Sequence, residues 1–267
     1  MNRESGVAGV PVFILAGGRG ERLSGVTAVP KALLDVGGRP FITYMLAALA
    51  AAGLRRVYLL TGYRGELFRE LANAGGSARG RSRAADDREP VEPSGYAGLE
   101  LQCLQEAEPL GTGGALRRAL PFVAERALVL NGDSYCGLDI AALLGFQAAR
   151  TGGLCLAAAR VEEVADFGCL AIEADDRLSG FREKGESGPG WINAGIYVLP
   201  RAFFEEALPA GRASLEHDIL PRWVAQRESW AYRTRAYFCD IGTPQRLAQA
   251  RGALPGQVAG SAGGGAS

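Results

Sequence analysis

The chain is poor in lysine and histidine and carries no net charge. Its 267 residues hold 29 basic and 29 acidic side chains with one histidine, and the only lysines are Lys31 and Lys184 among 27 arginines. A balanced charge gives no reason to expect a nucleic acid or a membrane surface as a partner. Unless the two lysines are chance survivors, we expect them at sites that need a compact ammonium rather than a planar guanidinium.

Two further absences narrow the class of protein. No apolar run approaches the ~20 residues of a membrane span, and the apolar stretch at 10–16 is short and runs straight into glycines, unlike a signal peptide. The five cysteines form no CxxC pair, so we expect no zinc site and reduced thiols in a cytoplasmic protein. With 48% hydrophobic residues, the chain is long enough for one large α/β domain.

Short apolar strands alternate with helices, which predicts an α/β fold with a doubly wound, mostly parallel Rossmann-like sheet and a small inserted β region. We expect strands at 12–15, 56–61, 99–104, 127–130, 154–161, 169–172, 196–199 and 232–239. Helices are expected at 41–52, 65–73, 114–120, 139–150 and 202–227 and from Pro244, with Thr243 as N-cap. Outside this body we expect an N-terminal extension at 1–10, a polar mobile loop at 75–98 and a disordered low-complexity tail at 251–267.

A glycine-rich turn follows the first strand and carries the most specific signal. Gly17, Gly18 and Gly20 present bare backbone N–H groups, and Arg22 and Lys31 add positive charge, a combination suited to polyphosphate. The Walker A pattern is absent, and the dinucleotide fingerprint fails because its third glycine is replaced by leucine and no acidic residue ends the second strand. An ordinary glycine-rich turn is the plain alternative.

Two aspartates follow predicted strands. Asp133 stands at the end of the strand at 127–130, and Asp240 directly after the strand at 232–239. Carboxylates at the carboxyl ends of parallel strands point into the ligand crevice, where they suit Mg²⁺ on phosphates. A turn aspartate and a helix-cap aspartate are the alternatives.

Together these strings resemble the sugar-1-phosphate nucleotidyltransferases. The pattern L-A-G-G-x-G-x-R-L followed by P-K matches Leu15–Leu23 and Pro30–Lys31, with Glu21 where the family more often has threonine, and E-P-L-G-T-G-G-A and N-G-D match further on. The resemblance covers residues 11–250 and implies the nucleotide-diphospho-sugar transferase fold, with a nucleotide-binding half at about 11–135 and a sugar-phosphate half at about 136–250.

The resemblance also implies roles for single residues. The catalytic residues would be Arg22, Lys31, Asp133 and Lys184, with Mg²⁺ as cofactor on Asp133 and Asp240. Nucleotide contacts would come from Leu15, Ala16, Gly17, Gly18, Gly20, Glu106, Pro109, Gly111, Thr112 and Gly132. Sugar-phosphate contacts would come from Gly168, Glu183, Lys184, Asn193 and Glu216. The Glu183–Lys184 pair is similar to the family's Glu-Lys-Pro motif, with Gly185 in place of the proline.

Glu106 suggests which base is read. It stands where thymidylyl- and many uridylyltransferases have glutamine. An ionised carboxylate only accepts hydrogen bonds, and guanine offers it two adjacent donors whereas uracil and thymine offer one. Glu106 therefore favours GTP, unless Glu106 or Glu108 is simply a solvated acid at a strand end.

Within the family, the strings at 36–41, 108–115, 131–134, 192–197 and 214–218 are most similar to guanylyltransferases that act on a heptose 1-phosphate. The expected partners are two small molecules, an NTP and a sugar 1-phosphate, and a homo-oligomer is left open. The rivals are a uridylyl- or thymidylyltransferase, a non-catalytic nucleotide-sugar sensor, and a glycosyltransferase, which would need a D-x-D motif that Asn131–Asp133 does not form. The lone histidine, His217, is not expected to be catalytic.

Overall fold

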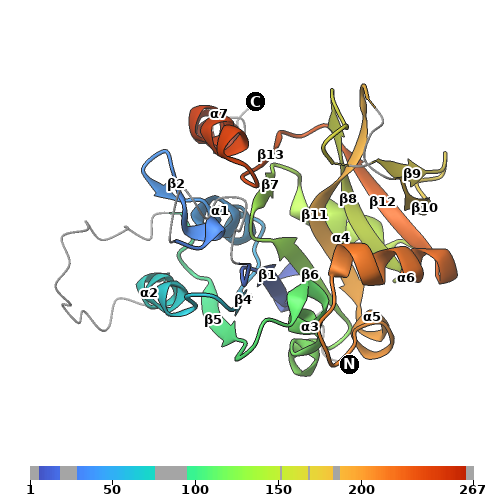
Figure 1. Cartoon of the computed structure of the whole chain (residues 1–267), viewed down its shortest axis with the longest axis horizontal. Helices are drawn as coiled ribbons and strands as arrows, with labels where there is room; N and C mark the ends of the chain where they lie inside the picture. The colour runs from blue at the N-terminus through green and yellow to red at the C-terminus, as the bar shows by residue number, and fades with distance from the viewer. Residues whose placement is uncertain are drawn as a thin grey trace.

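A seven-stranded mixed sheet forms the centre of the molecule (Figure 1). The computed structural model describes residues 6–18, 29–75, 95–150, 152–167, 169–182 and 187–262. The strand order is β12-β8-β11-β6-β1-β4-β5, where the strands span β1 Val12–Leu15, β4 Arg56–Thr61, β5 Glu100–Gln105, β6 Arg126–Asn131, β8 Leu154–Val161, β11 Gly190–Pro200 and β12 Ser229–Thr234. β11 runs antiparallel to both of its neighbours, and the other neighbouring strands are parallel. The predicted doubly wound, mostly parallel sheet is therefore confirmed.

Three two-stranded ribbons accompany this sheet. β2 (Asp35–Val36) pairs with β3 (Arg39–Pro40), and β9 (Leu170–Ile172) pairs with β10 (Leu178–Phe181), which forms the predicted small β region. β7 (Ser134–Cys136) pairs antiparallel with β13 (Phe238–Asp240) and places Asp240 opposite Ser134. This last ribbon brings two distant stretches of the chain together beside the end of β6.

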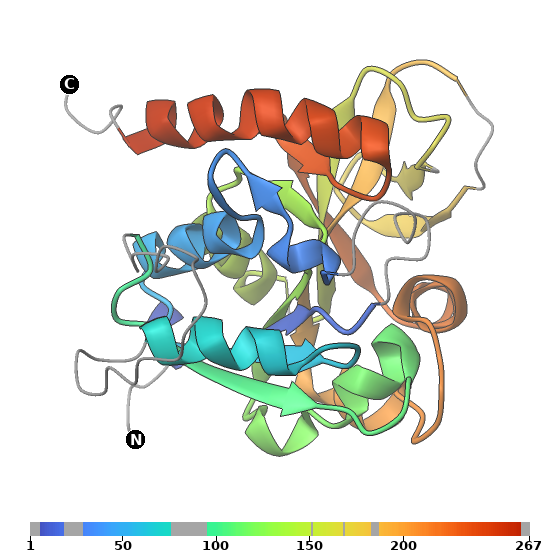
Figure 2. The same cartoon turned by 60° about the vertical axis from the view of Figure 1, so that its left-hand side comes forward.

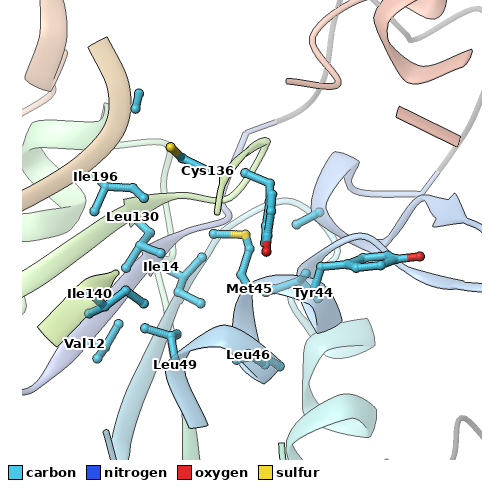
Figure 3. Close-up of a cluster of buried hydrophobic side chains, with 14 of the residues drawn as sticks. Val12, Ile14, Tyr44, Met45, Leu46, Leu49, Leu130, Cys136, Ile140 and Ile196 are labelled. Atoms are coloured by element: carbon cyan, nitrogen blue, oxygen red, sulfur yellow. The ribbon is translucent and has the colours of Figure 1, made fainter. Parts of the chain in front are cut away.

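The alternation of side chains along the strands gives the sheet two buried faces. On one face Val12, Ile14 and Leu130 pack against Leu49 of α1 and Ile140 of α4 (Figure 3). On the other face Phe13 and its neighbours pack against α3, α5 and α6. The first face is covered by α1 (Ile42–Ala51), α2 (Glu66–Gly75), α4 (Ile140–Ala148) and α7 (Pro244–Ala262), and the second by α3 (Gly111–Arg117), α5 (Arg201–Glu206) and α6 (Leu220–Gln226).

The C-terminal segment corrects one prediction. Residues 251–262, expected to be disordered, continue α7, which crosses the outside of the molecule as a long helix (Figure 2). Leu254 and Ala250 are fully buried against the core, so tertiary packing holds a helix that its glycines and internal Pro255 would weaken alone. The predicted cap is confirmed, since Thr243 Oγ1 accepts from the N–H of Arg246 at 3.3 Å. Residues 263–267 lie outside the described residues.

Other element boundaries also differ from expectation. The helix expected at 202–227 is three pieces, α5, the π-helix η5 (Leu215–Ile219) and α6, because Pro209 and Gly211 fall in an intervening loop. The single strand expected at 232–239 is split into β12 and β13. β11 begins six residues earlier than expected and contains a register irregularity after Asn193.

The segments expected to lie outside the folded body partly belong to it. In the region 1–10, Val7–Gly9 forms a 3₁₀ turn and Val10 is buried, so this end packs on the domain. At the end of the predicted 75–98 loop, Tyr96 is buried within a turn, and residues 76–94 lie outside the described residues. Over the described ranges, no helix has the length and apolar character that crossing a membrane requires.

Candidate active site

A cavity of about 910 Å³ opens where β1, β4, β5 and β6 end. β1 lies between β4 and β6 in the sheet, so the strands that follow it in the chain are placed on both of its sides. The cavity lies at this switch point, which is the usual ligand crevice of such folds. Twelve of the residues predicted from the sequence line it: Leu15, Ala16, Gly17, Gly18, Lys31, Glu106, Pro109, Gly111, Thr112, Gly132, Asp133 and Glu216. The structure thus brings most of the described predicted residues to one place.

Lys31 and Asp133 form an ion pair in the wall of this cavity. Lys31 begins the 3₁₀ turn η3 (Lys31–Leu33), and its Nζ lies 3.3 Å from Oδ2 of Asp133, which follows β6. The side chains are 21% and 41% exposed, so the pair faces the cavity rather than the core. In this position an ammonium and a carboxylate can both reach a bound polyphosphate or its counter-ion.

Glu106 lies at the end of β5 with its backbone fixed to β4. Its N–H donates to the carbonyl of Thr61 at 2.8 Å, and its Oε2 accepts from the N–H of Leu110 at 3.1 Å. Burial raises the pKa of this carboxyl, while the Leu110 N–H and the charge of Arg118 act in the opposite direction. The carboxylate is therefore held in a partly dehydrated position, where hydrogen bonds to a ligand are stronger than in water.

Close backbone approaches explain two of the glycines here. A Cβ on Gly62 would lie 2.6 Å from Oε1 of Glu106, so a side chain at this position would displace the carboxylate. A Cβ on Gly132 would lie 2.6 Å from the carbonyl oxygen of Leu15, to which the Gly132 N–H donates at 3.0 Å. Gly132 needs glycine because the backbones of β1 and β6 converge there, whereas glycine at position 62 leaves room for the Glu106 carboxylate.

The glycines after Pro109 have two different roles. The Gly113 N–H donates to the carbonyl of Ala213 at 2.9 Å, and a Cβ on Gly114 would lie 2.5 Å from the carbonyl oxygen of Gly211. These glycines let the loop at 211–213 pack on α3, while the preceding Gly111 and Thr112 line the cavity.

Glu216 is the centre of a hydrogen-bond network on the β6 side. Its Oε2 accepts from Thr112 Oγ1 at 3.2 Å, and its Oε1 accepts from Asn131 Nδ2 at 3.1 Å. Tyr197 is fully buried behind it, with its hydroxyl 3.5 Å from Oε1, and both burial and the Glu216 charge raise the pKa of this phenol well above 10. The network holds the carboxylate at the cavity wall.

Asn193 supports this network from outside the cavity. Its Nδ2 donates to the Tyr197 hydroxyl at 2.9 Å, and its Oδ1 accepts from the N–H of Gly195 at 3.0 Å. Asn193 does not line the cavity, so its direct contact with the sugar phosphate stays a prediction. Gly195 has φ +72° and accommodates the irregularity of β11.

Asp240 does not line the cavity, although it lies close to Asp133, which does. The β7–β13 pairing places Asp240 opposite Ser134, the residue after Asp133, and the Ile241 N–H donates to the Asp133 carbonyl at 2.9 Å. Its side chain is only 14% exposed and binds Arg246, with the N–H of Gly242 at 2.8 Å from Oδ1. Its role as a metal ligand stays a prediction, and it requires exchange of the arginine for a metal.

The charges around the cavity suit a divalent cation. The described lining carries four carboxylates, Glu106, Glu108, Asp133 and Glu216, but only two cations, Lys31 and Arg212. These described side chains taken alone would repel a triphosphate, so a cation bound with it would be favoured here. Asp133 has the exposure and the hard oxygen donor that Mg²⁺ requires, so the residues present fit this ion. No cluster of three or more histidine, cysteine or acidic side chains suited to a metal occurs among the described residues.

Several predicted residues fall where the structure gives no description. Arg22, Gly20, Gly168, Glu183 and Lys184 all lie outside the described residues. His217 is described, is exposed and does not line the cavity.

The structure adds lining residues that we did not expect from the sequence. Among them are the polar or aromatic side chains of Tyr63, Gln105, Asn131 and Arg212. Three of them occupy positions at or just after the ends of β4, β5 and β6, a placement that could have identified them once the strands were assigned. Arg212 had no such signal, because it belongs to a loop that tertiary packing brings onto α3.

Residues 11–255 match the sequence pattern of a family described as Nucleotidyl transferase. The chain belongs to this family. A mannose-1-phosphate guanylyltransferase of Mycobacterium tuberculosis is 34% identical over 242 residues, covering 88% of this chain and 62% of that protein, so the chain spans less than two thirds of that relative. A D-glycero-alpha-D-manno-heptose 1-phosphate guanylyltransferase of Aneurinibacillus thermoaerophilus is 30% identical over 241 residues, covering 90% of this chain and 96% of that one.

Solved structures of the family agree with the fold. HddC from Yersinia pseudotuberculosis, crystallised with GMP-PN, superposes with a TM-score of 0.74 at 30% identity and covers 92% of this chain and 99% of that one. The family resemblance and the fold expected from the sequence are thereby confirmed, and so is the expectation of an enzyme of nucleotide-sugar synthesis.

Proposed function

We propose that the chain transfers a guanylyl group from GTP to a sugar 1-phosphate, with D-glycero-α-D-manno-heptose 1-phosphate as acceptor, and releases pyrophosphate. The observation that carries the choice of base is the Glu106 carboxylate in the cavity wall beside Gly62. Guanine presents N1–H and the exocyclic amine side by side, and a carboxylate accepts from both. Relatives named as guanylyltransferases, at 30% and 34% identity, support the same choice.

The reaction needs charge neutralisation and alignment more than acid–base chemistry. A phosphate oxygen of the sugar 1-phosphate forms a bond to the α-phosphorus of GTP, the bond from this phosphorus to the α–β bridging oxygen breaks, and pyrophosphate carries away the electron pair. The nucleophile is already an anion, so no side chain has to remove a proton. Lys31, held 3.3 Å from Asp133, offsets phosphate charge at the edge shared by β1 and β6.

Asp133 is the residue that would hold Mg²⁺, and Asp240 would join it if Arg246 gave way. When bound, this ion supplies Lewis-acid stabilisation of the charge on the reacting phosphates. The ion pair with Lys31 keeps the Asp133 carboxylate directed at the cavity before substrates bind.

The sugar end of the cavity is proposed to lie at Glu216. Its carboxylate is held by Thr112 and Asn131 and can accept hydrogen bonds from sugar hydroxyls. In this proposal Lys184 grips the sugar phosphate and Glu183 reaches the sugar, as the family motif implies. Mannose 1-phosphate is a second candidate acceptor, since the Mycobacterium relative is named for it and a manno-heptose has the same ring configuration.

The test is pyrophosphate release with GTP, UTP, dTTP, ATP and CTP, each paired with heptose, mannose and glucose 1-phosphates. We expect the highest kcat/KM for GTP with the manno-configured heptose 1-phosphate. Preference for UTP or dTTP would overturn the guanylyl assignment, and preference for mannose 1-phosphate would overturn the heptose assignment alone. Tight binding of GDP-sugars without turnover of any pair would favour a regulatory protein instead.

A further inference from the structure

One aromatic side chain at the cavity has no role in the mechanism above. Tyr63 follows β4 and is 43% exposed, and it is the one large hydrophobic side chain that is exposed among the described residues. It lines the cavity together with Gly62, Gln105 and Glu106. Aromatic rings are usually covered in folded proteins because they bury a large apolar area, so an exposed ring in a ligand cavity indicates a ligand that covers it.

The backbone at Tyr63 is held in an unusual turn. The Gly65 N–H donates to the carbonyl of Gly62 at 3.2 Å, which makes Tyr63 and Arg64 the central residues of a β-turn. Arg64 has φ +53°, and Asp176 is the only other described non-glycine residue with positive φ. Aspartate tolerates this region well, whereas a turn with positive φ at its second central residue normally has glycine there. Strain of this kind at a cavity rim is more often kept for function than for folding.

The order of strands places Tyr63 at the same end of the cavity as Glu106, the residue proposed to read the nucleotide base. Glu106 directly follows β5 and Tyr63 follows the neighbouring strand β4, whereas Asp133 follows β6 on the far side of β1. A backbone hydrogen bond holds Tyr63 and Glu106 near each other, because the Glu106 N–H donates to the carbonyl of Thr61, two residues before Tyr63. A nucleotide with its phosphates at Lys31 and Asp133 would therefore extend its base over β4 and β5, away from Glu216.

From this placement we propose that Tyr63 stacks on the face of the nucleotide base while Glu106 reads its edge, so that Tyr63 selects purines over pyrimidines. The inference rests on the proposed function, since it requires the nucleotide in this orientation. A purine offers two fused rings to the phenol and a pyrimidine offers one, so stacking adds more to GTP binding than to UTP binding. The hydroxyl of Tyr63 has no part in this and its ring is sufficient.

The experiment compares Tyr63→Leu with Tyr63→Phe in the full chain. Affinities for GTP, UTP and inorganic tripolyphosphate are measured by calorimetry with Mg²⁺ and no sugar phosphate. We expect Tyr63→Leu to weaken GTP binding about tenfold or more, as loss of one base–aromatic stack does elsewhere. UTP binding should fall less, tripolyphosphate binding should stay the same, and Tyr63→Phe should keep GTP affinity within about twofold of wild type.

A variant at the strained position separates the ring from the fold. Arg64→Gly relieves the positive φ and keeps Tyr63, so it should raise the Tm while GTP affinity falls less than in Tyr63→Leu. Equal GTP affinities for Tyr63→Leu and Tyr63→Phe, or equal losses for GTP and tripolyphosphate, would overturn the stacking role. Neither result would contradict the guanylyl assignment, which depends on the wild-type preference among NTPs. A wild-type preference for UTP would contradict that assignment. The comparison of Tyr63→Leu with Tyr63→Phe, made with UTP, would then still measure stacking.

Discussion

The guanidinium of Arg246 contacts both carboxylate oxygens of Asp240, with Nη1 3.2 Å from Oδ1 and 3.0 Å from Oδ2. Its Nη2 donates to Asp166 at 2.8 Å, and the guanidinium lies 4.2 Å from the centre of the Phe167 ring. Arg246 therefore joins the end of β13 to the segment that precedes residue 168. An arginine in this position competes with a metal for Asp240.

The competition leads to a prediction about metal affinity. We expect Arg246→Gln to tighten binding of Mn²⁺, measured by electron paramagnetic resonance without substrates, because the carboxylate loses its competing cation. We expect Asp133→Asn to weaken Mn²⁺ binding about 10–100-fold, since an amide is a neutral ligand for a hard ion. Unchanged Mn²⁺ affinity in both Arg246→Gln and Asp240→Asn would reduce Asp240 to a structural partner of Arg246.

Lys31→Ala should reduce kcat/KM with little change in stability. Loss of one preorganised charge at the reacting phosphates typically lowers the rate about 10²–10³-fold. The Lys31–Asp133 pair is partly exposed, so its removal should change the free energy of unfolding by less than about 1 kcal/mol.

Lys31→Arg is the sharper comparison. A planar guanidinium would form a two-pronged pair with Asp133 and hold that carboxylate away from a metal. We expect Lys31→Arg to resemble Lys31→Ala in the pyrophosphate-release assay. A rate near that of wild type would show that any cation is sufficient there.

Glu106→Gln should shift the preference among bases. The amide places a donor against one of the guanine donors, and a mismatched buried hydrogen bond costs about 1–3 kcal/mol, so kcat/KM for GTP should fall about 10–100-fold. For UTP and dTTP the amide can pair with N3–H and a carbonyl, so their kcat/KM should rise or fall less. Glu108→Gln is the matched control, because Glu108 also lines the cavity and a solvated acid there would leave the base preference unchanged.

The raised pKa of Glu106 predicts a pH dependence of both binding and stability. The charged form accepts from guanine, so KM for GTP should rise on acidification at a pH above that of an ordinary glutamate. The folded state binds this proton more tightly than the unfolded state, so the stabilising contribution is present at acid pH and is lost as the pH rises through the folded-state pKa. Glu106→Gln should therefore be more stable than wild type at neutral pH, with the difference in Tm vanishing toward acid pH.

Leu254→Ala tests whether the end of α7 belongs to the core. Leu254 is fully buried, and a leucine-to-alanine change in such a site destabilises by about 2–5 kcal/mol. Gln257→Ala on the same helix is the control, since Gln257 is exposed and its replacement should be nearly neutral. Equal melting temperatures for the two variants would contradict the packing of this segment.

The sequence by itself determined the sheet and the nucleotide side of the cavity. Gly17 and Asp133 each stand just after a short apolar strand, and the carboxyl ends of parallel strands meet at one edge. Local order along the chain was therefore enough to predict that these two would lie together, whereas Glu106 was predicted from the resemblance to the family. The strands themselves followed from apolar runs, which report burial directly.

Only the tertiary structure decided the features that depend on distant segments. The Arg246–Asp240 pair requires β13 to pair with β7, the contacts of Asn193 depend on an irregularity in β11, and Arg212 reaches the cavity because the loop at 211–213 packs on α3. Residues 251–262 are helical because Leu254 finds a buried site, although their composition resembles a disordered tail. Side-chain partners and helix stability in these places come from packing between segments far apart in the chain, and that energy has no signature in the local sequence.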